Sequence, residues 1–182
     1  MLNFLKRLFG VSPPSGKAII IGLDGAGKSS ILSFIKQETN NIVVPTVGFS
    51  LEEFTYQGFS FNVFDMSGQS RYRDLWEHYI KEANAVIFVV DATDKLRLCV
   101  ARDELNNILQ HPNLKPVPFL LFANKMDLPD ALSPSTITTE LDLTTSLSNR
   151  NWHISSSCAV SGEGLDDGFG WLAKELKQPR AY

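Results

Sequence analysis

A short apolar run at residues 18–21 leads directly into a glycine-rich loop, and this junction constrains the fold of the 182-residue chain more than any other feature. The loop, residues 22–29, reads Gly-Leu-Asp-Gly-Ala-Gly-Lys-Ser and fits the pattern G-x-x-x-x-G-K-[ST]. Its glycines let backbone N–H groups turn inward toward an anion. A helix predicted over residues 28–37 would aim its positive dipole end at the same anion. Strand, loop and helix together predict a phosphate-binding α/β fold.

The rest of the chain alternates strand-like and helix-like segments. Residues 49–54 and 59–64 alternate apolar and polar side chains around Tyr56-Gln57-Gly58, which is typical of a β-hairpin. Further strands are predicted over residues 85–90, 117–122 and 152–156, and further helices over residues 96–111 and 165–177. The predicted fold is therefore a P-loop α/β domain, with a mostly parallel six-stranded sheet, one antiparallel edge strand and helices on both faces.

Composition excludes several classes of protein. A hydrophobic content of 43% with 20% charged residues is ordinary for a globular domain, and a net charge of −3 argues against a nucleic-acid partner. The two cysteines, Cys99 and Cys158, show neither a disulfide framework nor a metal-ligand spacing, which fits a reducing compartment, the cytosol or the nucleus. No apolar run is long enough to cross a bilayer.

The N-terminal segment, MLNFLKRLFGV, predicts a short amphipathic helix. Its apolar positions are Leu2, Phe4, Leu5, Leu8 and Phe9. Such a helix could lie on a membrane surface through apolar burial and basic contacts, or it could pack on its own domain. A Ser-Pro-Pro-Ser-Gly breaker at residues 12–16 separates the helix from the rest of the chain. We therefore expect a helix and linker over residues 1–16, followed by one nucleotide-binding domain over residues 17–182.

Within the glycine-rich loop, Lys28 is predicted to reach the β- and γ-phosphates, and the Ser29 hydroxyl is predicted to ligate Mg²⁺. The other expected phosphate-site residues are Asp24, Gly25, Ala26, Gly27 and Ser30. This loop alone does not choose between ATP and GTP, so a kinase or an ATPase is still open on its evidence.

The base is predicted from a second motif, Asn124-Lys125-Met126-Asp127, which follows a buried strand. Guanine presents two donors on one edge, N1–H and the exocyclic amine, and the Asp127 carboxylate could accept both, whereas adenine has no such pair. Lys125 would lay its stem along the base, and Asn124 would tie this loop to the phosphate loop. A third loop, Ser157, Cys158 and Ala159, offers a backbone N–H of its alanine to the guanine O6. These loops favour GTP.

Two further segments are predicted to sense the γ-phosphate. Asp65 would hold Mg²⁺ through a water, the Gly68 N–H would bond the γ-phosphate, and Gln69 would orient the attacking water. Thr46 can offer its hydroxyl to Mg²⁺ and its N–H to the γ-phosphate, so both segments would be ordered by GTP. Residues 38–46 contain no arginine, so intrinsic hydrolysis should be slow and a partner should supply the missing charge. A nucleotide-locked scaffold with negligible turnover is the alternative.

The motifs GLDGAGKS, PTVGF, DMSGQ, NKMD and SCA resemble the Arf and Arf-like small GTPases from about residue 17 to the C-terminal helix. The resemblance implies a monomeric G domain over residues 17–182 that binds GTP or GDP together with Mg²⁺. It also implies two protein partners, an exchange factor and a GTPase-activating protein. It also implies that GTP binding slides the hairpin and frees the N-terminal helix for a membrane surface. The implied effector surface consists of Phe49, Phe64 and Tyr79.

The stretches VFDMSGQSRYRDLWEHYIKE, FANKMDL and SGEGL are similar to a ciliary branch of this family. That similarity implies a GTP form that recruits the Bardet–Biedl coat complex, which carries membrane cargo to the cilium or ciliary base. Two positions depart from the family pattern. Phe64 stands where tryptophan is usual, and Leu2 stands where N-myristoylation requires glycine.

Overall fold

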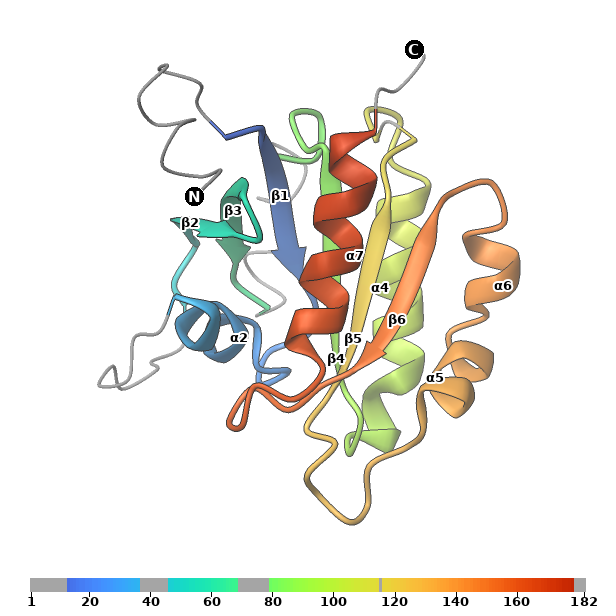
Figure 1. Cartoon of the computed structure of the whole chain (residues 1–182). Coiled ribbons are helices and arrows are strands. Elements are labelled where there is room, and N and C mark those ends of the chain that lie inside the picture. Colours follow the sequence, from blue (N-terminus) through green and yellow to red (C-terminus); the bar gives the residue numbers. More distant parts are fainter. Residues whose placement is uncertain (1–12, 37–45, 69–78, 115, 179–182) are drawn as a thin grey trace.

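The computed structural model describes residues 13–36, 46–68, 79–114 and 116–178. The predicted N-terminal helix and Gln69 lie outside these residues. A six-stranded sheet with the order β2-β3-β1-β4-β5-β6 forms the centre of the molecule (Figure 1). The strands are β1 (Ser15–Ile21), β2 (Phe49–Tyr56), β3 (Phe59–Met66), β4 (Ala85–Asp91), β5 (Phe119–Asn124) and β6 (Trp152–Ser156).

Strand pairing confirms the predicted sheet. β2 pairs antiparallel with β3 at one edge, and every other neighbouring pair is parallel. Both hairpin strands run two residues further than predicted, to Tyr56 and Met66. β1 begins at Ser15, inside the predicted linker, because Ser15 and Gly16 pair with Ser60 and Phe61 of β3.

Helices cover both faces of the sheet, as predicted (Figure 1). Helices α2 (Lys28–Ile35) and α7 (Leu165–Lys177) lie over one face, while α4 (Leu98–Leu109), α5 (Pro134–Glu140) and α6 (Leu143–Ser146) lie over the other. Alternate side chains of each buried strand enter opposite cores: Ile20 packs with the α2 and α7 residues, and Ile19 with those of α4 to α6. Burial on both faces explains why β4 and β5 are continuously apolar. Among the described helices, none has the length and apolarity that a membrane crossing requires.

Four helical elements differ from the sequence prediction. The helix expected over residues 96–111 consists of a 3₁₀ turn, η2 (Lys95–Arg97), followed by α4, and α2 ends at Ile35. Helices α5 and α6 were not predicted. The start of α5 does carry a local signal, because the Ser133 hydroxyl accepts a hydrogen bond from the Thr136 N–H at 3.1 Å and Pro134 occupies the first helical turn.

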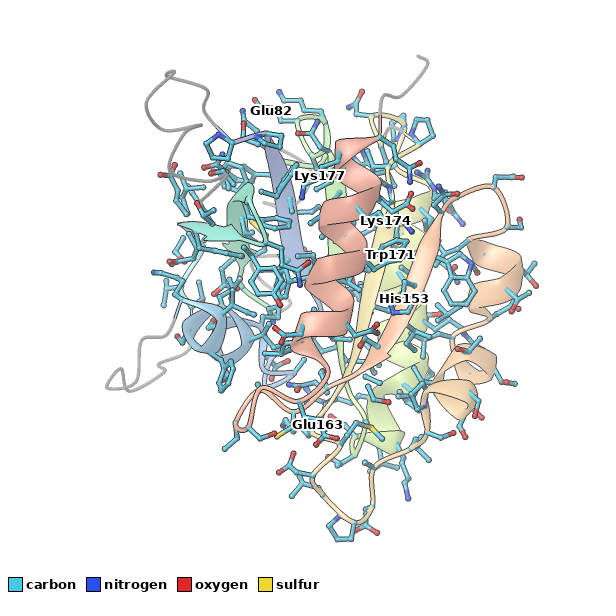
Figure 2. All side chains as sticks on the ribbon, viewed as in Figure 1. Glu82, His153, Glu163, Trp171, Lys174 and Lys177 are labelled. Atoms are coloured by element: carbon cyan, nitrogen blue, oxygen red, sulfur yellow. The ribbon has the colours of Figure 1, made fainter. Side chains whose placement is uncertain are left out.

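Helix α7 is anchored to the edge strand β6 by polar and aromatic contacts. Figure 2 shows Trp171 of α7 beside His153 of β6, and their ring centroids lie 5.4 Å apart in a stacked arrangement. His153 Nε2 also forms a hydrogen bond of 2.8 Å with Asp167 Oδ2. These contacts fix the helix over the β5–β6 side of the sheet, so the loops at the carboxyl ends of the strands have a rigid support.

Candidate nucleotide-binding site

The glycine-rich loop joins β1 to α2 at the carboxyl end of the parallel strands, where α/β sheets bind ligands. Lys28 is 6% exposed, and its Nζ donates hydrogen bonds to the carbonyl oxygens of Gly22 at 3.1 Å and Leu23 at 2.9 Å. Helix α2 has Gly27 at its N-cap and no acidic residue in its first turn. No side chain of the described chain caps it, so its first N–H groups face the loop. The ammonium group of Lys28, the backbone of the glycine-rich loop and the dipole of α2 thus converge on one anion-binding position.

Three oxygen-bearing side chains from separate elements meet beside this loop. Ser29 Oγ lies 3.0 Å from Thr46 Oγ1 and donates to Asp65 Oδ2, and Thr46 Oγ1 lies 3.2 Å from the same carboxylate oxygen. Asp65 is 3% exposed, and its Oδ1 has no hydrogen-bond partner among the described residues. A buried carboxylate oxygen without a partner, grouped with two hydroxyls, fits the all-oxygen ligand set that Mg²⁺ prefers.

The electrostatic state of Asp65 follows from its position. Burial raises the pKa of its carboxyl, while the hydrogen bond from Ser29 and the nearby charge of Lys28 oppose that rise. The net effect is a raised pKa, so burial disfavours the ionised carboxylate, and a cation bound between Asp65, Ser29 and Thr46 would stabilise it.

Gly68 lies directly on the backbone of the phosphate loop. A Cβ at this position would stand 2.4 Å from the Asp24 nitrogen and 2.4 Å from the Leu23 carbonyl carbon. Only a residue without a side chain permits this approach. The structure therefore brings Gly68 to the loop at Asp24, whose side chain is exposed.

Asn124 connects the three loops that the sequence assigns to the nucleotide. Its Nδ2 donates to the Ala26 carbonyl at 2.8 Å, and its Oδ1 accepts from the Ala159 N–H at 3.1 Å and the Ser157 hydroxyl at 3.4 Å. Gly27 makes room for this side chain, since a Cβ there would stand 2.3 Å from Asn124 Nδ2. The predicted tie between the base-reading and phosphate loops is thus observed.

The remaining base-site residues are placed around that connection. Asp127 is exposed beyond the end of β5, while Ser157 and Cys158 are buried and Ala159 is half-buried. The Ala159 N–H, which is expected to contact the guanine O6, bonds Asn124 in this structure. In the phosphate loop, Gly25 is exposed at the tip and Ser30 is half-buried within α2.

Sequence reasoning missed Asp91, the last residue of β4. Its Oδ2 lies 2.6 Å from Lys125 Nζ, and its Oδ1 accepts from the N–H and hydroxyl of Thr93 at 2.9 and 2.7 Å. Burial raises the pKa of Asp91, but the hydrogen bonds from Lys125 and Thr93 outweigh it and hold the pKa below its usual value. The ion pair fixes the head of the Lys125 side chain. The available signal was the position of Asp91 at the carboxyl end of a buried strand.

The predicted effector residues form a contiguous group, which we call the aromatic cluster: Phe49, Phe64 and Tyr79. The Tyr79 ring centroid lies 4.7 Å from those of both Phe49 and Phe64, which are 6.4 Å apart. Phe49 remains 45% exposed, and neighbouring Leu51 remains 49% exposed. The cluster therefore presents apolar surface beside the β2–β3 hairpin.

The sheet is mostly parallel and is covered on both faces, and the glycine-rich loop after β1 is linked by Asn124 to the loop after β5. This arrangement defines a P-loop nucleotide-binding domain of the small-GTPase type. The model of the ADP-ribosylation factor family matches residues 1–176, and the chain belongs to this family. It is 46% identical over 181 residues to ADP-ribosylation factor-like protein 6 of Danio rerio, with 97% of each chain covered.

A solved structure of the Arl6 BBS3 small GTPase from Trypanosoma brucei, with the bound nucleotide analogue GppNp, superposes with a TM-score of 0.84 at 37% identity. The match covers 89% of this chain and 97% of that one. Family membership makes the chain a GTP-binding switch that hydrolyses GTP, with the dependence on a GTPase-activating protein that is standard for the family. It excludes the alternatives of a P-loop kinase and of an ATPase.

Proposed function

We propose that this GTPase, in its GTP form, recruits a multi-subunit coat to a membrane for ciliary trafficking. The observation that carries the proposal is the meeting of Ser29, Thr46 and Asp65 at one point. Thr46 precedes β2 and Asp65 is the penultimate residue of β3, so a ligand at this point contacts both ends of the hairpin that bears Phe49 and Phe64 of the aromatic cluster. Nucleotide state and effector surface are thereby linked through one hairpin.

We assign the phosphates to Lys28, the first turn of α2 and the loop of residues 22–29, with Thr46 and Gly68 at the γ-phosphate. Mg²⁺ would be held by Ser29 and Thr46 directly and by Asp65 through water, and it would neutralise charge on the β- and γ-oxygens. Gln69 would orient the attacking water, an assignment that rests on the DMSGQ motif. The activating protein would supply the cation that residues 38–46 do not contain.

Guanine selectivity is assigned to Asp127 and the Ala159 N–H. The exposed position of Asp127 leaves both of its oxygens accessible to the two guanine donors. Asp127→Asn should shift preference from guanosine toward xanthosine nucleotides, because the carboxamide replaces an acceptor by a donor. Competition between GDP and xanthosine diphosphate measures this shift, and unchanged preference would remove Asp127 from the base site.

The partner assignment is supported by the relatives, one named ADP-ribosylation factor-like protein 6 and the other Arl6 BBS3. We propose the Bardet–Biedl coat complex as effector, and a location in the cytoplasm and at the membrane of the cilium or ciliary base. Residues 1–16 would form the membrane contact and residues 17–182 a monomeric G domain. Because a single short helix is a weak anchor, membrane attachment should be reversible.

Capture of coat subunits on the full chain loaded with GDP or with a non-hydrolysable GTP analogue tests the proposal. Coat subunits should be retained only on the analogue-loaded protein, and Phe49→Ala should lower retention because it removes the most exposed ring of the cluster. Val160→Ala is the matched control, since Val160 is 85% exposed and lies outside the aromatic cluster. Equal capture in both nucleotide states would refute the proposal.

A further inference from the structure

The phosphate loop contains an acid at its third position, Asp24, where a negative charge opposes the ligand. Gly68, which we assign to the γ-phosphate, approaches the loop at the backbone nitrogen of Asp24. Asp24 therefore lies at the γ-phosphate end of the proposed site. A carboxylate near a triphosphate repels it, and the repulsion grows with the number of phosphates. The loop therefore needs a compensating cation at Asp24.

Arg97 supplies that cation from a distant part of the chain. Its Nη1 donates to Asp24 Oδ1 at 3.1 Å, and its Nη2 donates to the Asp24 backbone carbonyl at 3.3 Å. One guanidinium thus contacts both the side chain and the main chain of the loop. A bidentate contact of this kind fixes direction as well as charge, which a single ammonium would not do.

Arg97 is itself held in place from its other side. Its Nε donates to Asp94 Oδ2 at 2.5 Å, and its backbone N–H donates to Asp94 Oδ1 at 3.3 Å. The Asp94 hydrogen bond, with a smaller contribution from the charge of Asp24, raises the pKa of Arg97 above its usual value. The guanidinium therefore remains charged and lies between two carboxylates, that of Asp94 at the N-cap of η2 and that of Asp24 on the phosphate loop.

We infer that Arg97 is a positioning residue for nucleotide binding, which neutralises Asp24 and holds its carboxylate away from the γ-phosphate, so that it sets the preference for GTP over GDP. The inference rests on the proposed phosphate site. Since GTP carries the additional charge at the end of the site where Gly68 meets Asp24, loss of Arg97 weakens GTP binding more than GDP binding. The two side chains are 41% and 55% exposed, so added salt screens the effect.

The test measures dissociation constants of the full chain for fluorescent GDP and for a fluorescent non-hydrolysable GTP analogue at low salt. Arg97→Ala should lower the ratio of analogue affinity to GDP affinity about fivefold, because the unpaired Asp24 carboxylate then repels the additional phosphate of the analogue. Asp24→Asn should restore the ratio in the double variant, because it removes the charge that Arg97 neutralises. Arg97→Lys should retain most of the ratio, since it keeps the cation.

Arg102→Ala is the matched control, because Arg102 is an exposed arginine on α4, one turn beyond Arg97. It should leave the ratio unchanged. Equal weakening of both nucleotides by Arg97→Ala, or no rescue by Asp24→Asn, would overturn the inference. The inference would also be overturned if Arg97→Ala left both nucleotide affinities unchanged but slowed single-turnover GTP hydrolysis, because Arg97 would then act on the reaction itself. If the wild-type chain binds neither nucleotide, the proposed phosphate site is wrong instead.

Discussion

The side-chain amide of Asn124 donates a hydrogen bond of 2.8 Å to the carbonyl of Ala26, which lies 98 residues earlier in the chain. The same side chain accepts from Ala159 and Ser157, so one buried group joins the phosphate loop to both loops assigned to the base. Buried polar groups that satisfy one another in this way make the loops a single unit.

Replacing Asn124 by alanine should therefore loosen the whole site. The change leaves the Ala26 carbonyl and the Ala159 N–H without their partner, and we expect the free energy of unfolding to fall by about 2 kcal/mol. GDP should also dissociate faster. Urea denaturation and nucleotide release measure the two effects. Asn151→Ala, which removes an exposed hydrogen bond to Glu175, is the control and should change little. An unaltered release rate would show that the loops are held independently.

Asp65→Asn should stabilise the metal-free protein and at the same time abolish Mg²⁺-dependent nucleotide binding. The raised pKa means that the folded protein binds this proton more tightly than the unfolded chain does, so ionisation of Asp65 costs stability at neutral pH. The neutral amide removes that cost and should raise the free energy of unfolding without Mg²⁺, while Mg²⁺-dependent nucleotide binding is lost.

The gain from Asp65→Asn should shrink as the pH falls through the folded-state pKa, because the wild-type carboxyl is then neutral as well. Thermal denaturation at neutral and acidic pH measures this difference. Asp103→Asn, an exposed position on α4, controls for the loss of an acid in general. A destabilised metal-free Asp65→Asn protein would contradict the electrostatic account.

Gly68→Ala should disrupt the approach of the β3 end to the phosphate loop. Its Cβ would stand 2.4 Å from backbone atoms of Asp24 and Leu23, which cannot move aside as a flexible side chain can. We expect binding of a non-hydrolysable GTP analogue to weaken by about tenfold, in line with overpacking costs of 1–3 kcal/mol. Gly170→Ala should leave binding unchanged, since its Cβ meets only the Gln57 side chain, at 3.3 Å. Isothermal titration calorimetry measures the dissociation constant of the analogue for each variant. If Gly68→Ala bound the analogue as tightly as the wild-type protein, Gly68 would lie away from the γ-phosphate.

Tyr56 should ionise later than an ordinary tyrosine. Burial and the hydrogen bond that its hydroxyl donates to Asp166 raise the pKa of Tyr56 to about 12. Between pH 10 and about 12 the Tyr56 hydroxyl is ionised in the unfolded chain but still protonated in the folded chain. The contribution of Tyr56 to the free energy of unfolding is therefore fully present below pH 10 and is lost as the pH rises to about 12. Ultraviolet titration should show a late ionisation step that Tyr56→Phe removes. Asp166→Asn should move the step to lower pH, and an unmoved step would exclude Asp166 as a cause.

Much of the fold and the site is local in sequence and was therefore predictable. The apolar runs of β4 and β5, the hairpin turn at Gln57 and Gly58, and the phosphate loop before α2 each carry their own signal. The grouping of Phe49, Phe64 and Tyr79 was expected only through the family resemblance, and the ring contacts agree with it.

The missing parts depend on contacts that no local pattern encodes. Arg97 meets Asp24 across 73 residues, and Asp91 meets Lys125 across 34, so only the assembled sheet brings each pair together. Helix α5 was missed for another reason. Its threonine-rich sequence has weak helix propensity, and its stability comes from burying Ile137 against the core.

Strand β3 joins two ends of the molecule that the sequence keeps apart. Asp65 stands near its carboxyl end, while at its other end Ser60 donates to the Pro14 carbonyl and Lys177 of α7 donates to the Gln57 carbonyl in the adjoining turn. From Phe59 to Met66 the strand spans roughly 23 Å, and pairing on both sides prevents it from bending freely. Because Asp65 and Ser60 belong to one strand that is paired on both sides, a ligand that shifted the register of β3 against β1 would also break the hydrogen bond between Ser60 and Pro14, where the chain enters the sheet.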